Sequence, residues 1–455
     1  MTEDALRARA RSAVADARLN DAVGAATRHL TTERIRAFDE LANREVLRGS
    51  ARTVRERTLA RLPELLGLLA DRVEAAGGRV FFAVDGDEAC RYVLEVAQRR
   101  GARLIAKSKS MVTEEIHLTP ALERAGLRVV ETDLGEWIVQ LAGQRPSHIV
   151  APALHLNRRD IADIFARHGA EGITDEPTAL TAYARGELRR VFLSADVGIS
   201  GGNFAVAETG TVCLVTNEGN GRMVTSVPPV HIAIMGMERV VGTWAELDLL
   251  VSLLARSATG QVLSSYTTMI TGPRRPGEVD GPEEFHLVVL DGGRTHVLGS
   301  PYREALHCIR CGACLNICPV YRQIGGHAYG SVYGGPIGAV VSPLLCGAEF
   351  RDLRLASSLC GACFQVCPVM IPLQDLLLEE RREAAPRAGR AERWLWRLWA
   401  RAWSSPGFYR LSTWAARWGA RLLPGRLVPR WGAGRDLPHE RWGRGRATKG
   451  RSSGA

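Results

Sequence analysis

Three common sequence features are missing from this 455-residue chain. The first residues alternate charge with alanine and lack an apolar core followed by small residues, so we expect no export signal. The longest run without charge or histidine, residues 328–348, is broken by Pro336, Pro343 and five glycines, which predicts a loop rather than a membrane span. No G-x-G-x-x-G follows a predicted strand. We therefore expect a cytoplasmic protein with no NAD or flavin site.

Positive charge is concentrated at one end of the chain. Residues 381–455 hold 18 Lys plus Arg and 4 Asp plus Glu, a net charge of +14, which leaves −4 for the remainder of a chain whose total is +10. A mildly acidic body does not suit a nucleic-acid-binding surface, and no nucleic-acid-binding fold is recognisable. We expect no nucleic-acid partner, and any anionic partner should meet the basic end.

The rhythm of apolar residues predicts several domains. Residues 1–54 have helical spacing, whereas residues 55–298 alternate short apolar runs with charged helical stretches, the pattern of βαβ units around a largely parallel sheet. Residues 299–380 contain eight of the ten cysteines. Helical periodicity returns in residues 381–436, which are rich in tryptophan and arginine, and residues 437–455 have no periodicity and are expected to be disordered.

Cysteine spacing carries the strongest chemical signal. Cys308, Cys311, Cys314 and Cys318 precede Pro319 in the pattern C-x2-C-x2-C-x3-C-P, the bacterial ferredoxin spacing for 4Fe-4S clusters. The first three thiolates of such a run bind one cluster, and the fourth binds a second cluster. A structural zinc site is the alternative, but the third closely spaced cysteine and the partial repeat of the pattern argue against it.

A second run repeats only the last three cysteines of this motif. Crosswise pairing assigns four cysteines to cluster 1 and three to cluster 2, namely Cys308, Cys311, Cys314 and Cys367, then Cys318, Cys360 and Cys363. Cluster 2 therefore lacks one thiolate, and Ser357 occupies the position where the full motif has a cysteine. Cys346, Ser357 or a solvent oxygen can complete the cluster, or a 3Fe-4S cluster remains. We favour an open or non-cysteine corner, because Cys346 is equally well explained as a small buried hydrophobe.

Two parts of the chain resemble known families. The segments NFAVAETGT, LVTNEGNGR and PPVHIAIMGMERVV resemble the LUD domain of lactate utilisation proteins, over roughly residues 55–298. The segments HCIRCGACLNICPVYRQIGGHAYG and SSLCGACFQVCPVMIPLQD closely resemble the lactate utilisation protein B (LutB/LldF) family of iron–sulfur proteins. Members of that family are similar in showing seven cysteines, so the missing thiolate is expected as a family trait.

The resemblance implies both a fold and a function. The fold would be an α/β LUD domain, related to sugar-phosphate isomerases and CoA transferases, with N-terminal helices, an α-helical ferredoxin-type domain and a C-terminal helical region. The function would be that of an iron–sulfur electron-transfer subunit with two 4Fe-4S clusters. Such a subunit works with a second iron–sulfur subunit and a LUD-only subunit to oxidise L-lactate to pyruvate, so its own role is non-catalytic or co-catalytic.

Loops of the LUD region supply further candidates. Glu208, Asn217, Glu218 and Asn220 can line a pocket for a small carboxylate or act as acid and base, although tight turns and local capping explain them equally well. The competing hypothesis is therefore a LUD enzyme that acts on a small carboxylate or CoA-like ligand and carries regulatory clusters. The basic Trp/Arg helices are expected to dock on an acidic subunit, with peripheral membrane contact as the alternative.

The remaining candidates have plain structural explanations. A solvated charge pair accounts for Lys107 and Lys109 better than an anion site with Ser108 does, and His231 is expected to be packed. His307 either tunes a cluster through a hydrogen bond or is an exposed loop residue. Cys90 and Cys213 lie in apolar settings and are expected in the core.

Overall fold

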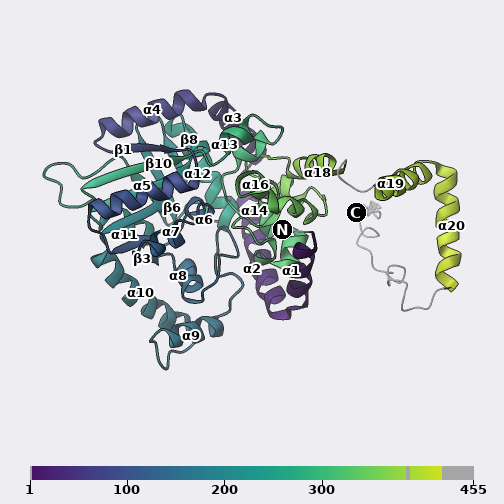
Figure 1. Ribbon diagram of the computed structural model, residues 1–455, viewed down its shortest axis with the longest axis horizontal. Coiled ribbons are helices and arrows are strands. Elements are labelled where there is room, and N and C mark those ends of the chain that lie inside the picture. The colour runs from purple at the N-terminus through teal and green to yellow at the C-terminus, as the bar shows by residue number, and fades with distance from the viewer. Residues whose placement is uncertain (1–2, 386–389, 423–455) are drawn as a thin grey trace, which may run out of the picture. The chain divides into compact units, whose positions relative to one another are not determined.

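The computed structural model describes residues 3–385 and 390–422, and it divides the chain into two compact units, Met1–Arg382 and Glu383–Ala455 (Figure 1). The segment 437–455, for which disorder is predicted, lies outside the described residues. None of the helices within the described ranges has the length and apolar character that crossing a membrane requires.

Helices precede the first strand, as their apolar spacing predicts. They are α1 (Glu3–Ala15), α2 (Ala17–Asp39), α3 (Arg44–Ala60) and α4 (Leu62–Ala75). The Asp16 side chain caps α2 by accepting a hydrogen bond from Leu19 N, and Gly77, with φ of 89°, follows α4. Helices α1 and α2 pack on the cysteine-rich segment, whereas α3 and α4 contact strands. The N-terminal helices thus join the two halves of the first unit.

A six-stranded, fully parallel sheet forms the centre of the LUD region (Figure 1). Its strands are β1 (Arg79–Ala83), β2 (Leu104–Lys107), β3 (Arg128–Glu131), β4 (Val197–Gly201), β7 (Val230–Gly236) and β10 (Glu284–Leu290), in the order β1-β10-β7-β4-β2-β3. Successive side chains enter different cores, since Ile105 packs with one set of helices and Ala106 with another. Helices therefore cover both faces of the sheet, as expected for parallel strands.

The helices of this region fall into the two covering layers and the connections. They are α5 (Gly86–Arg99), α6 (Met111–Glu115), α7 (Leu118–Arg124), α8 (Leu134–Leu141), α9 (Arg158–Arg167), α10 (Pro177–Ser194), α11 (Asn220–Ser226), α12 (Trp244–Thr259) and the 3-10 helix η1 (Met237–Arg239). Helices α5 and α7 contribute to the core on one face, and α8, α9 and α10 to the core on the other.

A second sheet connects the LUD region to the cysteine-rich segment. It consists of β5 (Phe204–Val206), β6 (Thr211–Thr216), β8 (Val240–Val241) and β9 (Tyr266–Ile270), in the order β8-β5-β6-β9. Its buried residues share one continuous hydrophobic core with the N-terminal helices and with Leu306, Leu315 and Ile337 of the cysteine-rich segment. The boundaries predicted at residues 54 and 298 are therefore crossed by a common core, and they stay predictions.

After α13 (Arg294–Leu298) at the end of the LUD region, short helices make up the cysteine-rich segment, which begins at residue 299. They are η2 (Arg303–His307), α14 (Ala313–Ile317), α15 (Pro319–Ile324), η3 (His327–Tyr329), α16 (Gly335–Leu345), η4 (Ala348–Leu355), α17 (Ala362–Val366) and α18 (Leu373–Ala384). The loop predicted for residues 328–348 is wrong over α16, which is almost entirely buried. Pro336 is tolerated because it lies in the first turn, where its missing N–H has no intrahelical partner, and Pro343 lies two residues before the end of the helix.

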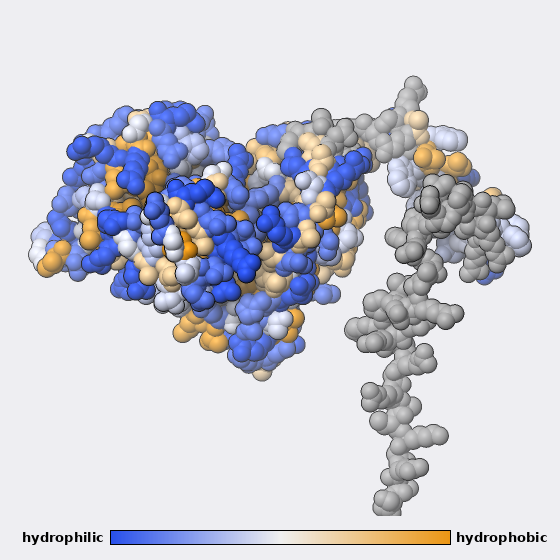
Figure 2. Space-filling view, turned by 90° about the horizontal axis from the view of Figure 1, so that it is seen from below, coloured by the Kyte–Doolittle hydropathy of each residue, from blue (hydrophilic) through white to orange (hydrophobic). Residues whose placement is uncertain are grey.

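The second unit contains two described helices, α19 (Arg390–Trp403) and α20 (Pro406–Leu422). Many of their large apolar side chains are exposed, including Trp394 at 65% and Trp414 at 59%. Figure 2 shows hydrophobic surface, coloured orange, beside hydrophilic surface on this unit. The two helices therefore have the amphipathic character predicted from the sequence.

Candidate metal centre and neighbouring pockets

The two cysteine runs adopt the same local structure, with each residue of the second lying 49 positions after its counterpart in the first. Arg310 and Leu359 precede a cysteine and have φ of 60° and 55°, an unusual conformation for residues other than glycine. Gly312 and Gly361 follow that cysteine with φ of 75° and 77° and begin α14 and α17. The sequence repeat is thus also a repeat of a strained backbone loop.

The thiols form two sets. Cys308, Cys311, Cys314 and Cys367 line one small cavity. Burial, followed by the neighbouring Cys367 and Cys308 thiols, raises the pKa of Cys311 to about 12. Burial, followed by Cys318, raises the pKa of Cys363 to about 11, and Cys360 also acts on it. The structure therefore brings Cys308, Cys311, Cys314 and Cys367 together as a first set, and Cys318, Cys360 and Cys363 as a second set.

Ser357 is the counterpart of Cys308 in structure as well as in sequence. The Arg310 N–H donates to Cys308 Sγ at 3.4 Å, and the Leu359 N–H donates to Ser357 Oγ at 3.1 Å. Cys346, in contrast, caps the C-terminus of α16. Burial raises the pKa of Cys346 to about 12, and the charged groups that act on its thiol are Glu115, Arg310 and Arg294, with no cysteine among them.

The two sets differ in exposure. Cys360 of the second set is exposed, whereas Cys311, Cys314 and Cys367 of the first set are buried.

Arginines of the N-terminal helices bind the backbone of the second cysteine loop. Arg48 of α3 donates to Cys367 O from Nε at 3.0 Å and from Nη2 at 2.9 Å. Arg34 of α2 donates to Val366 O at 2.6 Å. Helices from the start of the chain thus fasten the second cysteine loop with buried guanidinium groups.

Several guanidinium groups lie near Cys308. The Cys308 thiol interacts electrostatically with Arg55, Arg239 and Arg310. These three and the neighbouring Arg294 face the carboxylates of Glu115, Glu238 and Glu246. Burial opposes ionisation of Glu238, but Arg294, Arg239 and Arg310 lower its pKa to about 2. Buried cations need nearby anions, and four thiolates around an iron–sulfur cluster supply negative charge. The first set and its surroundings therefore fit a bound 4Fe-4S cluster.

Sequence reasoning missed these arginines. Arg55 is fully buried, and its Nη2 donates to Leu306 O at 3.0 Å and also to Glu238 O. Arg34, Arg48 and Arg55 lie on helices with ordinary amphipathic spacing, so the sequence gives no sign that they are special. Only the tertiary contacts between distant segments show that they lie beside the cysteines.

A cavity of about 270 Å³ lies beside the first cysteine loop. Asn217, Glu218 and Asn220 line it, so the structure brings these predicted residues together. Ile309 and Arg310 line both this cavity and the smaller one formed by the first set of cysteines. Glu208 is not among the lining residues; it is exposed and accepts a hydrogen bond from Trp244 N at 2.7 Å, at the start of α12.

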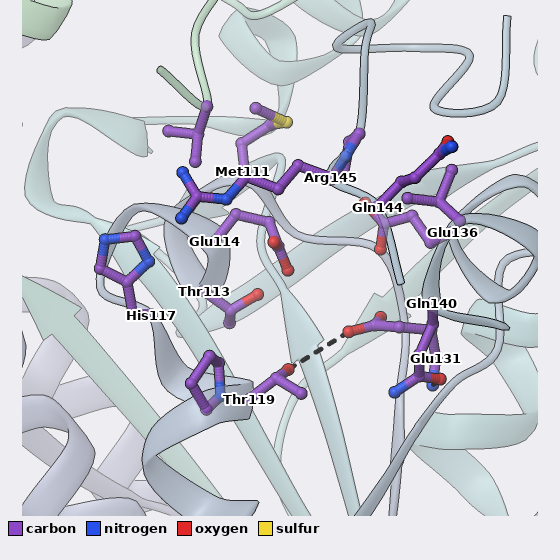
Figure 3. Close-up of a pocket in the computed structure, with 14 residues that line it drawn as sticks. Met111, Thr113, Glu114, His117, Thr119, Glu131, Glu136, Gln140, Gln144 and Arg145 are labelled. Atoms are coloured by element: carbon purple, nitrogen blue, oxygen red, sulfur yellow. Dashed lines mark hydrogen bonds between the residues drawn. The ribbon is translucent and has the colours of Figure 1, made fainter. Parts of the chain in front are cut away.

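A second cavity, of about 190 Å³, follows the ends of β2 and β3. Figure 3 shows the carboxylates of Glu114, Glu131 and Glu136 turned toward one another in it, and their oxygens lie within 4.8 Å. Beneath them, fully buried Lys107 binds Glu114 at 3.0 Å and Glu131 at 2.8 Å. The solvated charge pair expected for Lys107 is wrong, because the Lys107 side chain is fully buried and its partner Glu131 is buried as well. The ammonium pairs with two of the three carboxylates, and these ion pairs link the ends of two strands.

Burial also decides the protonation of this acidic group. Burial, followed by the charge of Glu131, raises the pKa of Glu136 well above its ordinary value. Burial opposes the charged form of Lys107, but Glu131 and Glu114 raise its pKa overall. At neutral pH we therefore expect a neutral Glu136 beside a charged Lys107.

The other candidate residues are structural. His231 is fully buried, lies 2.8 Å from Ser200 Oγ through Nε2 and stacks on Phe285, so it is packed as predicted. His307 is 3% exposed, and burial followed by Arg55 lowers its pKa to about 4. The exposed-loop alternative for His307 is therefore wrong. Cys213 is buried in β6, and Cys90 is half-buried on α5.

Comparisons with known proteins agree with this architecture. The family described as LUD domain matches residues 66–290, the 4Fe-4S dicluster domain matches residues 304–396, and the family described as lactate utilisation protein B, C-terminal, matches residues 379–441. A solved structure, a DUF162 family protein from Deinococcus radiodurans, is 16% identical and covers 50% of this chain and 98% of its own, with a TM-score of 0.30. The strand order and the domain matches, rather than that overlap, establish the fold.

Curated relatives extend over most of the chain. Lactate utilization protein B of Shouchella clausii is 51% identical over 91% of this chain and 86% of its own. The protein of the same name from Bacillus subtilis is 49% identical over 85% of this chain and 81% of its own. A protein called "Uncharacterized electron transport protein YkgF", from Escherichia coli, is 48% identical over 95% and 93%.

Fold and site together define an iron–sulfur protein in which a LUD α/β domain is joined to a 4Fe-4S dicluster domain. The chain belongs to the lactate utilisation protein B family. The resemblance stated from the sequence is thereby confirmed.

Proposed function

We propose that this chain is the iron–sulfur electron-transfer subunit of a complex that oxidises L-lactate to pyruvate. The observation that carries the proposal is the pair of matching cysteine loops, which gather seven thiols into two adjoining sets. Cys308, Cys311, Cys314 and Cys367 would hold cluster 1, and Cys318, Cys360 and Cys363 would hold cluster 2. A bound 4Fe-4S cluster accepts and releases one electron at a time.

The arrangement of the two sets supports a direction for electron flow. The first set is buried except for the half-buried Cys308, and it shares the wall residues Ile309 and Arg310 with the large cavity of the LUD region. Cys314 is close enough to Cys363 for their charges to interact, so the sets adjoin. Cys360 of the second set is exposed to solvent. Electrons would enter at the cavity side and leave through the exposed side to a partner.

Lactate oxidation releases two electrons and two protons, and two sites that each accept one electron match that number. The partners would be a second iron–sulfur subunit and a LUD-only subunit, as the family resemblance implies. A LUD enzyme with merely regulatory clusters is the competing function. The shared wall between cavity and first set favours direct coupling instead, because a regulatory cluster needs no contact with the ligand site.

Iron content tests the assignment first. We expect about eight irons and eight sulfides per chain after anaerobic reconstitution, or about seven irons if the incomplete corner of cluster 2 is empty. Iron and zinc are measured by elemental analysis on the same monomeric fraction. Zinc in place of iron, or about four irons in fully reconstituted protein, would contradict two iron–sulfur clusters.

The basic second unit is proposed to dock on an acidic partner subunit. Along α19, Trp399 contacts Trp396 edge to face and stacks on Trp403. Arg397 and Arg401 are spaced one turn apart on the same helix. Deletion of residues 385–455 should leave iron content unchanged, because every proposed thiolate precedes this segment, while association with the partner subunits is lost.

Co-purification of tagged partners measures that association, and the charge-reversal variant Arg397→Glu/Arg401→Glu should weaken it without deletion. Unchanged co-purification of both variants would refute the docking role. Loss of binding to anionic vesicles with partner association intact would instead show that the unit contacts membranes.

A further inference from the structure

The large cavity lies where the strand order reverses. β2 leads outward to β3, whereas β4 leads to β7 and β10 on the other side, so the crevice beyond the carboxyl ends of β2 and β4 is a topological switch point. Lys109 and Ser110 follow β2, Gly201 ends β4, and all three line the cavity. Open α/β sheets bind their ligands in such crevices. This position marks the cavity as a ligand site.

Positive charge lies on the side of the cavity next to the cysteine loop. Arg239 and Arg310 line the cavity and reach the single carboxylate of Glu238 at only 3.4 Å and 3.8 Å. That carboxylate is already bound more closely by Arg294, at 2.7 Å. The Nη1 group of Arg310 has no hydrogen-bond partner among the described residues. Two guanidinium groups, of which Arg310 has an unused donor, suit a carboxylate ligand.

Neutral polar and apolar groups also line the cavity. Asn220 is 7% exposed, and its carboxamide oxygen has no partner within the described part of the chain. An amide oxygen only accepts hydrogen bonds, so this one gains a partner when a ligand brings a hydroxyl or N–H group beside it. Ile234 and Leu254 supply apolar wall, which suits a short carbon chain.

We propose that this cavity binds a small carboxylate carrying a hydroxyl on the adjacent carbon, a 2-hydroxy acid, with Arg239 and Arg310 on the carboxylate and the Asn220 carboxamide oxygen accepting from the hydroxyl. The proposal deepens the proposed function, on which it rests, because it places the substrate class against the loop of the first cysteine set. A CoA-like ligand is the alternative occupant, and the test must distinguish it from a small carboxylate.

Glu218 makes the binding depend on pH. Burial, followed by the charge of Asp133, raises the pKa of Glu218 to about 7, against the opposing effects of the Leu134 N–H and Lys109. Arg239 and Arg310 are the other charged groups that line the cavity. Below pH 7 Glu218 is neutral and tolerates an anionic ligand, whereas above pH 7 its charge repels the ligand. Affinity should therefore fall as the pH rises through about 7.

The test measures binding to the full chain with its clusters reconstituted. Oxamate is the probe, because it carries an N–H donor on the carbon next to its carboxylate, where a 2-hydroxy acid carries its hydroxyl, and it is not oxidised. Propionate and coenzyme A are the comparison ligands. Calorimetry should show that oxamate binds and that Arg239→Gln weakens it about 10- to 100-fold, the loss of a charge-assisted hydrogen bond. Arg239→Lys should restore part of the affinity, and Glu218→Gln should abolish the pH dependence.

Control variants and ligands keep the result interpretable. Arg222→Gln removes an exposed arginine of α11 that does not line the cavity, and it should bind oxamate like the wild type. Propionate should bind more weakly than oxamate, because it has no hydrogen-bond donor on the second carbon. Unchanged cluster absorbance and circular dichroism would show that each variant is folded.

Several outcomes would overturn the proposal. They are absence of oxamate binding to protein with dithionite-reducible clusters, equal binding to Arg239→Gln, and preferred binding of coenzyme A. The proposed function fails separately, if oxamate binds as described but L-lactate never bleaches the cluster absorbance when the partner subunits are present.

Discussion

Cys311→Ala is expected to remove one cluster and leave the other, and Cys363→Ala should remove the opposite one. The reason is geometric, since Cys311 belongs to the buried set with Cys308, Cys314 and Cys367, whereas the thiols acting on Cys363 are those of Cys318 and Cys360. Each variant should retain about half of the iron. Electron paramagnetic resonance of the dithionite-reduced proteins should show complementary losses of signal.

Two further variants test the crosswise assignment of cysteines to clusters more directly. Cys318 belongs to the first run, but Cys318→Ala should remove the same cluster as Cys363→Ala does. Cys367 belongs to the second run, but Cys367→Ala should remove the same cluster as Cys311→Ala does. Cys90→Ala provides the matched control. This half-buried thiol donates to Ile116 O within the LUD region, so its removal should leave the iron content unchanged. If Cys318→Ala and Cys311→Ala abolished the same signal, each run would serve its own cluster and the crosswise assignment would be wrong.

The cysteine ligands could be proposed from sequence because their information is local. Successive gaps of two residues force three thiols into one curled loop, and the structure shows the same loop twice, with Gly312 and Gly361 in matching conformations. The parallel sheet was predictable for a similar reason, since alternating apolar strands and amphipathic helices have few other solutions. Neither prediction required knowledge of distant contacts.

The charge around the first set could not be predicted in this way. Arg48 contacts the carbonyl of Cys367, a residue 319 positions away in the chain, and Arg55 contacts Leu306 across 251 positions. An arginine on an amphipathic helix is normally solvent-exposed, so nothing in the local pattern distinguishes these residues. Only tertiary packing makes them counter-charges for buried thiolates.

The burial of Lys107 could not be predicted from its local sequence either. Two lysines around a serine at the end of a strand suggest a solvated group, but β2 is flanked by β3 and β4, so the Lys107 side chain is enclosed. Its partners Glu114 and Glu131 come from the following helix and the neighbouring strand. The sequence contains these residues, but the strand order that joins them is a property of the fold.

The second set of cysteines has three thiols where the first has four, and the structure shows what stands in place of the fourth. Ser357 Oγ accepts the Leu359 N–H where Cys308 Sγ accepts the Arg310 N–H, so the hydroxyl occupies the position of the missing fourth thiolate. The alternative ligand, Cys346, interacts with Glu115 and Arg310 rather than with the second set. Exposure of Cys360 gives oxidants access to this side. These contacts favour an iron that is bound by three protein sulfurs and an oxygen ligand.

Air or ferricyanide should therefore convert one of the two clusters to a 3Fe-4S form while the other resists, because an iron without a fourth thiolate is released more easily. Electron paramagnetic resonance of the oxidised protein detects the three-iron signal directly. Ser357→Cys should suppress that signal by supplying the missing thiolate, and Ser358→Cys is the matched control that places a thiol one residue away. If Cys346→Ala made an otherwise stable cluster labile and Ser357→Cys restored it, Cys346 would be the fourth ligand. A wild-type protein that never shows the three-iron signal under oxidation would refute the open corner, because both clusters would then be equally protected.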